Sequence, residues 1–173
     1  MTNASLTDAR LARSIALEAG ALLQAIRARG DASGKALGDI GDREANTLIV
    51  ARLREARPDD FILSEEALDD QARCAASRVW IVDPLDGTRE YAEGIDDWAV
   101  HIGLAIDGRP RIGSVAVPAR GAVHTTDDVH LPLPAAANPP RMVVSRSRAP
   151  EIAKTVALAM GTPMIAMGSS PEK

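Results

Sequence analysis

The chain has 173 residues, a formal net charge of −4 and 46% hydrophobic residues, a composition typical of globular proteins. It excludes wholesale disorder and a collagen-like repeat, and the single Cys74 excludes an internal disulfide. The length allows one domain or a domain and a half. No apolar run approaches the ~18 residues needed to cross a bilayer, and the amino terminus lacks a signal-peptide pattern. We therefore expect a cytoplasmic protein with no membrane partner.

The charge balance argues against a polymeric nucleic acid as partner. There are 20 basic and 24 acidic residues, and aromatic residues make up only 2% of the chain. A surface that binds nucleic acid is usually basic, and single-strand binding needs aromatic stacking platforms. A small anionic substrate remains open if bound cations supply the positive charge.

Two helices are predicted at the start of the chain. Residues 5–29 carry apolar side chains at helical spacing, with Ser5 or Thr7 as N-cap and Gly30 as the stop. A second apolar stripe, residues 45–53, predicts a helix that ends before a proline. We expect Asp42 at the start of this second helix, as its N-cap or as a functional acid.

Five strands are predicted next. Residues 61–63 and 79–82 form short runs of β-forming residues, and the second run reads as a central strand. Residues 98–106, 111–117 and 122–126 are separated by turn signals and predict an antiparallel meander.

A connector is predicted at residues 131–140, which contain four prolines and three consecutive alanines. It divides an α+β metal-binding subdomain, residues 1–130, from the start of a second α/β subdomain, residues 141–173. In the second part we expect a strand at 142–145, a helix at about 151–160 and a strand at 164–167.

The most informative stretch is Asp83-Pro84-Leu85-Asp86-Gly87-Thr88. Its two carboxylates lie three residues apart on an expected turn, with the Leu85 carbonyl between them, so all three can reach one hard cation. The structural alternative is an ordinary turn whose carboxylates cap the next helix.

A second acidic pair, Glu65-Glu66, also follows a predicted strand. Because strand ends in one sheet lie side by side, Glu65, Asp83 and Asp86 are expected to share a site. Carboxylates that cluster repel one another unless cations compensate, and Mg²⁺ is the natural cation. The three histidines lack zinc-ligand spacing and read as strand or loop residues: His101, His124 and His130.

Together these motifs resemble the inositol monophosphatase superfamily of magnesium-dependent, lithium-sensitive phosphomonoesterases. Ser64-Glu65-Glu66 resembles the family's upstream acidic motif, and Thr88-Arg89-Glu90-Tyr91 resembles its 3′(2′),5′-bisphosphate nucleotidase (CysQ-like) branch. Residues 144–147 and 168–170 also look like that branch. The resemblance extends over almost the whole chain and implies an α+β or α/β fold, a layered α-β-α-β-α sandwich of the sugar-phosphatase type.

The resemblance implies that two or three Mg²⁺ ions activate the attacking water. The implied metal ligands are Glu65, Asp83, Asp86 and the carbonyl of Leu85. Thr88, with Asp42, would orient and deprotonate the water, and the backbone N–H groups of Gly87 and Thr88 would receive the phosphate oxygens.

The implied substrate is 3′-phosphoadenosine 5′-phosphate, a by-product of sulfate assimilation, which would lose its 3′-phosphate. Arg146, beside Ser145, is expected to bind the second phosphate, because a guanidinium matches phosphate. Arg89 and Glu90 are expected on the ribose or base side, and Lys173 near a phosphate. Alternatives are an inositol-phosphate or fructose-bisphosphate phosphatase, or a metal-binding fragment without turnover.

Members of the family continue past the Gly-Ser-Ser motif to a Trp-Asp motif that completes the metal site. We therefore expect the second α/β layer to be truncated here, and a chain that is weakly active or inactive and prone to association. A homodimer is left open.

Overall fold

The computed structural model describes residues 7–65, 71–128, 139–146 and 148–168. Lys173, Glu66 and most of the predicted connector lie outside these residues. Within the described ranges, no helix is long and apolar enough to span a membrane.

Helix α1 (Asp8–Arg29) confirms the first predicted helix. The Thr7 hydroxyl accepts a hydrogen bond from the Arg10 amide, which satisfies one of the free N–H groups of the first turn. Gly30 ends the helix in the left-handed conformation at φ 69°, as expected for glycine after a last turn.

Helix α2 (Gly34–Ala56) begins well before the predicted start, so Asp42 lies inside the helix and the expectation that it caps the helix is wrong. The helix already includes Gly38 and Gly41, and these two glycines serve close packing. A Cβ on Gly38 would lie 2.9 Å from Thr88 Cγ2, and a Cβ on Gly41 would lie 2.9 Å from Tyr91 Cε1. Both glycines let α2 approach the segment that follows the acidic motif.

The main sheet has five strands in the order β1-β2-β3-β4-β5. The strands are β1 (Phe61–Ser64), β2 (Arg78–Asp86), β3 (Ala99–Ile106), β4 (Arg109–Val117) and β5 (Ala122–Thr125). β1 runs parallel to β2, and the remaining neighbours are antiparallel. The predicted meander is therefore confirmed. Asp107 and Gly108 join β3 to β4 with φ of 51° and 70°, the paired positive values of a tight hairpin turn.

A two-stranded parallel sheet follows later in the chain. It consists of β6 (Met142–Ser145) and β7 (Met164–Met167), connected through helix α4 (Glu151–Met160). These three elements confirm the predicted ones. The division into subdomains at residues 131–140 stays a prediction.

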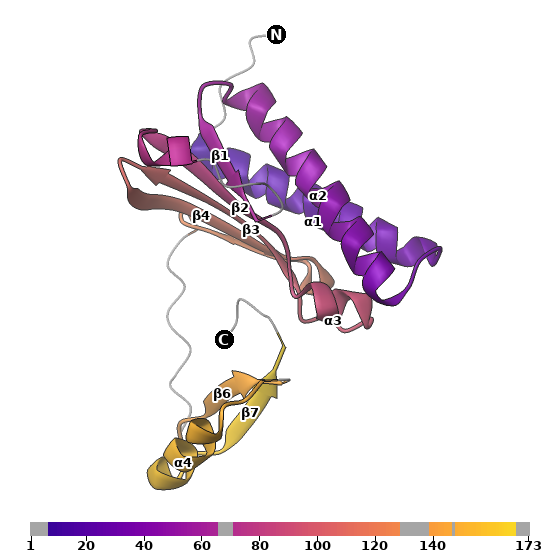
Figure 1. Cartoon of the computed structure of the whole chain (residues 1–173), viewed down its shortest axis with the longest axis vertical. Coiled ribbons are helices and arrows are strands. Elements are labelled where there is room, and N and C mark those ends of the chain that lie inside the picture. Colours follow the sequence, from indigo (N-terminus) through magenta and orange to yellow (C-terminus); the bar gives the residue numbers. More distant parts are fainter. Residues whose placement is uncertain (1–6, 66–70, 129–138, 147, 169–173) are drawn as a thin grey trace.

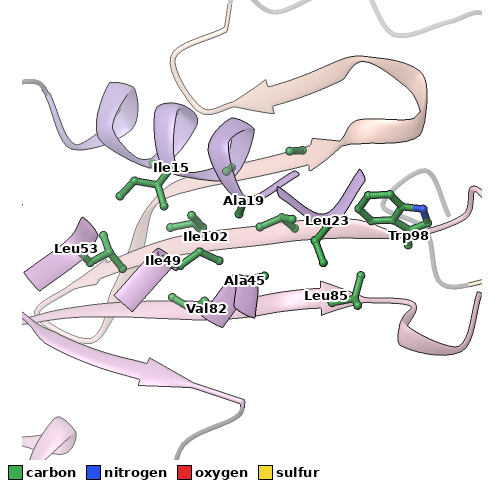
Figure 2. Close-up of a cluster of buried hydrophobic side chains, with 14 of the residues drawn as sticks. Ile15, Ala19, Leu23, Ala45, Ile49, Leu53, Val82, Leu85, Trp98 and Ile102 are labelled. Carbon is green, nitrogen blue, oxygen red and sulfur yellow. The ribbon is translucent and has the colours of Figure 1, made fainter. Parts of the chain in front are cut away.

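Helices α1 and α2 lie against the same face of the main sheet (Figure 1). The core fills the space between them, as Figure 2 shows for Leu23, Ile49, Val82 and Ile102, each at most 2% exposed. The remaining face of β2 carries Ile81, whose residue surface is 48% exposed. The helices therefore stabilise one side of the sheet only, within the described residues.

An ion-pair network closes the end of the sheet where β2 begins. The Asp60 side chain, 8% exposed, accepts hydrogen bonds from Arg78 Nε at 2.8 Å and Trp80 Nε1 at 2.8 Å. Asp8 accepts from Arg78 Nη2 at 2.9 Å and from Arg57 Nε at 2.8 Å. The network joins the first turn of α1 to the end of α2 and the start of β2.

Asp60→Ala is expected to destabilise the protein by about 3 kcal/mol, because it leaves Arg78 and the buried Trp80 N–H without their shared acceptor. Urea unfolding measures the change. The control is Asp59→Ala, an exposed neighbour, which is expected to change the free energy of unfolding by no more than about 0.5 kcal/mol. Equal effects of the two substitutions would contradict the importance of the network.

Candidate active site

The acidic motif lies on a bulged end of β2 and not on a turn after the strand. Asp83 pairs with His101 and Asp86 pairs with Ala99, so two residues of β2, Pro84 and Leu85, face one residue of β3. The expectation of a turn is therefore wrong. A bulge re-aims side chains and ends regular pairing, and here it lets both carboxylates depart from the strict alternation of a strand.

The chain turns sharply at Gly87, immediately after β2. Gly87 has φ 86°, and a Cβ there would lie 2.7 Å from the Asp97 carbonyl oxygen, so both the backbone conformation and the space require glycine. Helix α3 (Thr88–Ala92) begins at the next residue. Its N-cap is Gly87 and no side chain caps it, so the alternative that the carboxylates cap the next helix is not observed.

The peptide of Leu85 is fixed on both sides. Its N–H donates to Asp83 Oδ1 at 3.2 Å, and its carbonyl accepts from Thr88 Oγ1 at 2.9 Å. A carbonyl oxygen has two lone pairs, so this oxygen can still bind a cation while it accepts from Thr88.

Negative charge accumulates around Asp83. Burial raises the pKa of Asp83 to about 6, and the charges of Glu65 and Asp86 add to the shift, while His101 opposes it. Glu65 reaches the site because its N–H donates to Val82 O at 3.2 Å, which extends the pairing of β1 with β2 by one residue. Asp86 Oδ2 lies 3.4 Å from His101 Nε2.

The donor set fits a hard cation. It consists of carboxylates and a backbone carbonyl, the oxygen ligands that Mg²⁺ prefers. The raised pKa of Asp83 also indicates negative charge that a cation would compensate. In the part of the chain that the structure describes, however, no three His, Cys, Asp or Glu side chains are grouped closely enough to hold one ion together.

Asp42 lies on the side of α2 that faces α3. Gly38 contacts Thr88 and Gly41 contacts Tyr91, and Asp42 follows Gly38 by one helical turn. The structure therefore brings the half-buried Asp42 to the α3 side of its helix. Its action together with Thr88 stays a prediction.

Two of the predicted substrate residues, Arg146 and Ser145, lie at the end of β6. Arg146 Nη2 donates to Asp97 Oδ2 at 2.5 Å, which directs it toward the segment after α3. Ser145 Oγ, at the end of β6, accepts from the Arg148 N–H at 3.3 Å.

Of the other predicted substrate residues, Arg89 is exposed and pairs at 2.9 Å with Glu93, the C-cap residue of α3. Glu90 lies against Gly168, where a Cβ would be 2.8 Å from Glu90 Oε1. Lys173 lies outside the described residues.

Sequence reasoning missed the aromatic support under α3. Tyr91 Oη donates to the Leu23 carbonyl at 2.7 Å, and its ring meets Trp98 edge-on with centroids 5.1 Å apart. The Arg27 guanidinium lies 5.7 Å from the Tyr91 centroid and 5.5 Å from that of Trp98. No local pattern links α1 to residues so far along the chain.

A hollow of about 650 Å³ adjoins the acids on the sheet face away from α1 and α2. Ile81, Gly103 and Gly113 line it, and the two glycines pair directly across β3 and β4. Glu65 and Asp83 also line the hollow. Its polar groups therefore include the two carboxylates, and the paired glycines leave bare backbone between the apolar side chains.

Comparison with known proteins gives one family. Residues 7–131 match the model of the inositol monophosphatase family. The 3′-phosphoadenosine 5′-phosphate phosphatase of Mycobacterium leprae is 46% identical, over 98% of this chain and 68% of that protein. The phosphatase of the same name in Mycobacterium bovis is 45% identical, over 90% of this chain and 62% of that protein. The chain thus spans about two thirds of the length of these relatives.

Solved structures confirm the predicted fold class. CysQ from Bacteroides thetaiotaomicron superposes with a TM-score of 0.70 at 26% identity, over 93% of this chain and 72% of that chain. Inositol monophosphatase-II from Staphylococcus aureus gives 0.71 at 20% identity, over 92% and 65%. The second likeness concerns the fold alone.

Asp83→Asn is expected to raise the melting temperature of the metal-free protein by roughly a few degrees at about pH 8. The pKa of about 6 lies above the ordinary 3.8, so the folded state binds this proton more tightly than the unfolded state. Ionised Asp83 therefore destabilises the fold, and the gap between variant and wild type shrinks as pH falls through that window. Thermal melts with EDTA at several pH values measure it.

The matched control is Asp107→Asn in the exposed β3–β4 turn, which removes the same charge away from the acidic motif and is expected to raise the melting temperature less than Asp83→Asn does at about pH 8. Added Mg²⁺ is expected to stabilise wild type and not Asp83→Asn. A metal-free variant less stable than wild type at about pH 8 would contradict the electrostatic account.

Gly41→Ala is expected to destabilise the protein by about 1–3 kcal/mol, because the added Cβ meets Tyr91 Cε1 at 2.9 Å and Leu23 Cδ2 at 3.1 Å. The direction of the change in the free energy of unfolding serves as the control. At an uncrowded helical position the same substitution stabilises by about 1 kcal/mol. Chemical unfolding that gives a stabilising change would show that α2 does not need this close approach.

Proposed function

The chain belongs to the inositol monophosphatase family, and from this premise we propose that the protein is a phosphatase that removes the 3′-phosphate of 3′-phosphoadenosine 5′-phosphate. The observation that carries the proposal is the similarity to the mycobacterial phosphatases of that name, which extends over nearly the whole chain. We further propose that it acts in the cytoplasm and recycles a nucleotide by-product of sulfate assimilation.

In the proposed site, Glu65, Asp83, Asp86 and the Leu85 carbonyl hold two or three Mg²⁺ ions. When bound, Mg²⁺ supplies positive charge for the phosphate and lowers the pKa of water. The raised pKa of Asp83 supports this assignment, because ionisation of Asp83 is unfavourable without a compensating charge. The fixed Leu85 peptide supports it as well, since its oxygen keeps one orientation.

Thr88 and Asp42 are proposed to prepare the attacking water. The Thr88 proton is directed at the Leu85 carbonyl, so the lone pairs of Oγ1 remain to accept a hydrogen bond from water. The Asp42 carboxylate, on the neighbouring side of α2, then accepts the proton that the water loses.

The reacting phosphate is proposed to bind the N–H groups of Gly87 and Thr88. Helix α3 has only 5 residues, so these individual hydrogen bonds, and not a long helix dipole, provide the attraction. Arg146 and Ser145 are proposed for the second phosphate. We retain Arg89 and Glu90 for the ribose or base side and Lys173 for a phosphate.

Arg146→Ala is expected to weaken the binding of adenosine 3′,5′-bisphosphate by roughly tenfold, because the guanidinium contact with the second phosphate is lost, while adenosine 3′-monophosphate, which lacks that phosphate, is unaffected. The measurement is phosphate release and ligand affinity over a panel that also contains inositol 1-phosphate and fructose 1,6-bisphosphate. The matched control is Arg148→Ala, because this substitution keeps the backbone N–H that donates to Ser145 Oγ at 3.3 Å.

Equal loss with every ester would contradict the role of Arg146. Preferred turnover of inositol phosphate or fructose bisphosphate by wild type would contradict the nucleotide assignment. Binding of metal and nucleotide with no phosphate release would support the fragment without turnover.

A further inference from the structure

Asp97 connects the acidic motif to the ends of β6 and β7. Its backbone carbonyl lies against Gly87, where a Cβ would be 2.7 Å away. Its carboxylate Oδ2 accepts from Arg146 Nη2 at 2.5 Å and from the Gly168 N–H at 3.4 Å. One residue thus contacts the turn proposed for the reacting phosphate and the arginine proposed for the second phosphate.

The ends of β6 and β7 are held together independently of Asp97. The Arg146 N–H donates to the Met167 carbonyl at 2.8 Å, which continues the parallel pairing of the two strands. Gly168 packs so closely on Glu90 that a Cβ would lie 2.8 Å from Glu90 Cγ. These contacts fix the backbone of Arg146, but they leave the direction of its long side chain undetermined.

The carboxylate of Asp97 gives the Arg146 side chain a direction. The Asp97 side chain is 17% exposed and that of Arg146 is 40% exposed, so the acceptor is the better anchored partner. A guanidinium has five N–H groups in a rigid plane, and this bond uses one nitrogen, Nη2. The other nitrogens remain for an anion, with the plane already oriented.

We propose that Asp97 is a positioning residue for substrate selection: it holds Arg146 so that the guanidinium meets the second phosphate of a bisphosphate ester. The inference rests on the proposed function. A carboxylate near an anionic ligand would by itself repel that ligand. If repulsion by Asp97 dominates, its removal tightens the binding of the bisphosphate. If positioning of Arg146 dominates, its removal weakens that binding, so the direction of the change decides between the two.

The experiment measures affinities of the whole chain for adenosine 3′,5′-bisphosphate and for adenosine 3′-monophosphate, which lacks the second phosphate, by calorimetry, in EDTA to prevent turnover. Asp97→Asn is expected to weaken bisphosphate binding by about fivefold, the scale of a partly exposed ion pair, and to leave monophosphate binding unchanged. In the Arg146→Ala background, Asp97→Asn is expected to have no further effect, because Asp97 acts through Arg146.

Two further variants complete the test. Asp96→Asn removes the neighbouring charge, which pairs with Arg27 and not with Arg146, and is expected to leave both affinities unchanged. Asp97→Glu keeps the charge but moves the carboxylate by one methylene, and is expected to weaken bisphosphate binding by a smaller factor. If Asp97→Asn does not fold, Asp97→Glu is the variant that tests the proposal.

The outcomes separate the two proposals. Equal affinity of wild type for both ligands overturns the proposed substrate, and the role of Asp97 with it. A preference that Arg146→Ala abolishes and Asp97→Asn leaves intact, or tighter binding in Asp97→Asn, overturns the role of Asp97 alone.

Discussion

The repulsion among carboxylates at the end of β2 is the constraint on which the site depends. Asp83 is held near Glu65 and Asp86 although burial and both charges oppose its ionisation. Such an arrangement persists only where the surrounding structure fixes the backbone that carries it. The hydrogen bonds on either side of the Leu85 peptide do so directly, since they leave the motif little freedom to spread its charges apart.

The support for that backbone comes from distant parts of the chain. Gly41 lets α2 approach Tyr91, and Tyr91 is held in turn by the Leu23 carbonyl and the Trp98 ring. Trp98 follows Asp97, the residue whose carbonyl closes over Gly87. The packing of α1 and α2 is therefore connected with the geometry of the acidic turn, and substitutions far from the acids are expected to disturb it.

The sequence predicts the secondary structure and the type of metal ligand better than it predicts the contacts between distant segments. The helices and strands follow from periodicity, and the pattern from Asp83 to Thr88 indicates oxygen ligands for a hard cation. The sequence does not indicate the close packing at Gly38 and Gly41, because a glycine needed for a close approach looks the same in sequence as one that ends a helix. The contact of Asp97 with Arg146 joins residues 49 apart, and no local spacing encodes it. Contacts of this kind depend on the tertiary fold alone.

Charged side chains lie at both ends of β2, but their charges are compensated differently at the two ends. At its start, Arg78 lies between Asp60 and Asp8, whose hydrogen bonds raise its pKa, so that charge is compensated within the protein. At its other end, burial and the charges of Glu65 and Asp86 raise the pKa of Asp83 to about 6, although His101 opposes the shift. The unfavourable ionisation of Asp83 is the physical reason to expect a cation from outside, and with it the chemistry of phosphate esters.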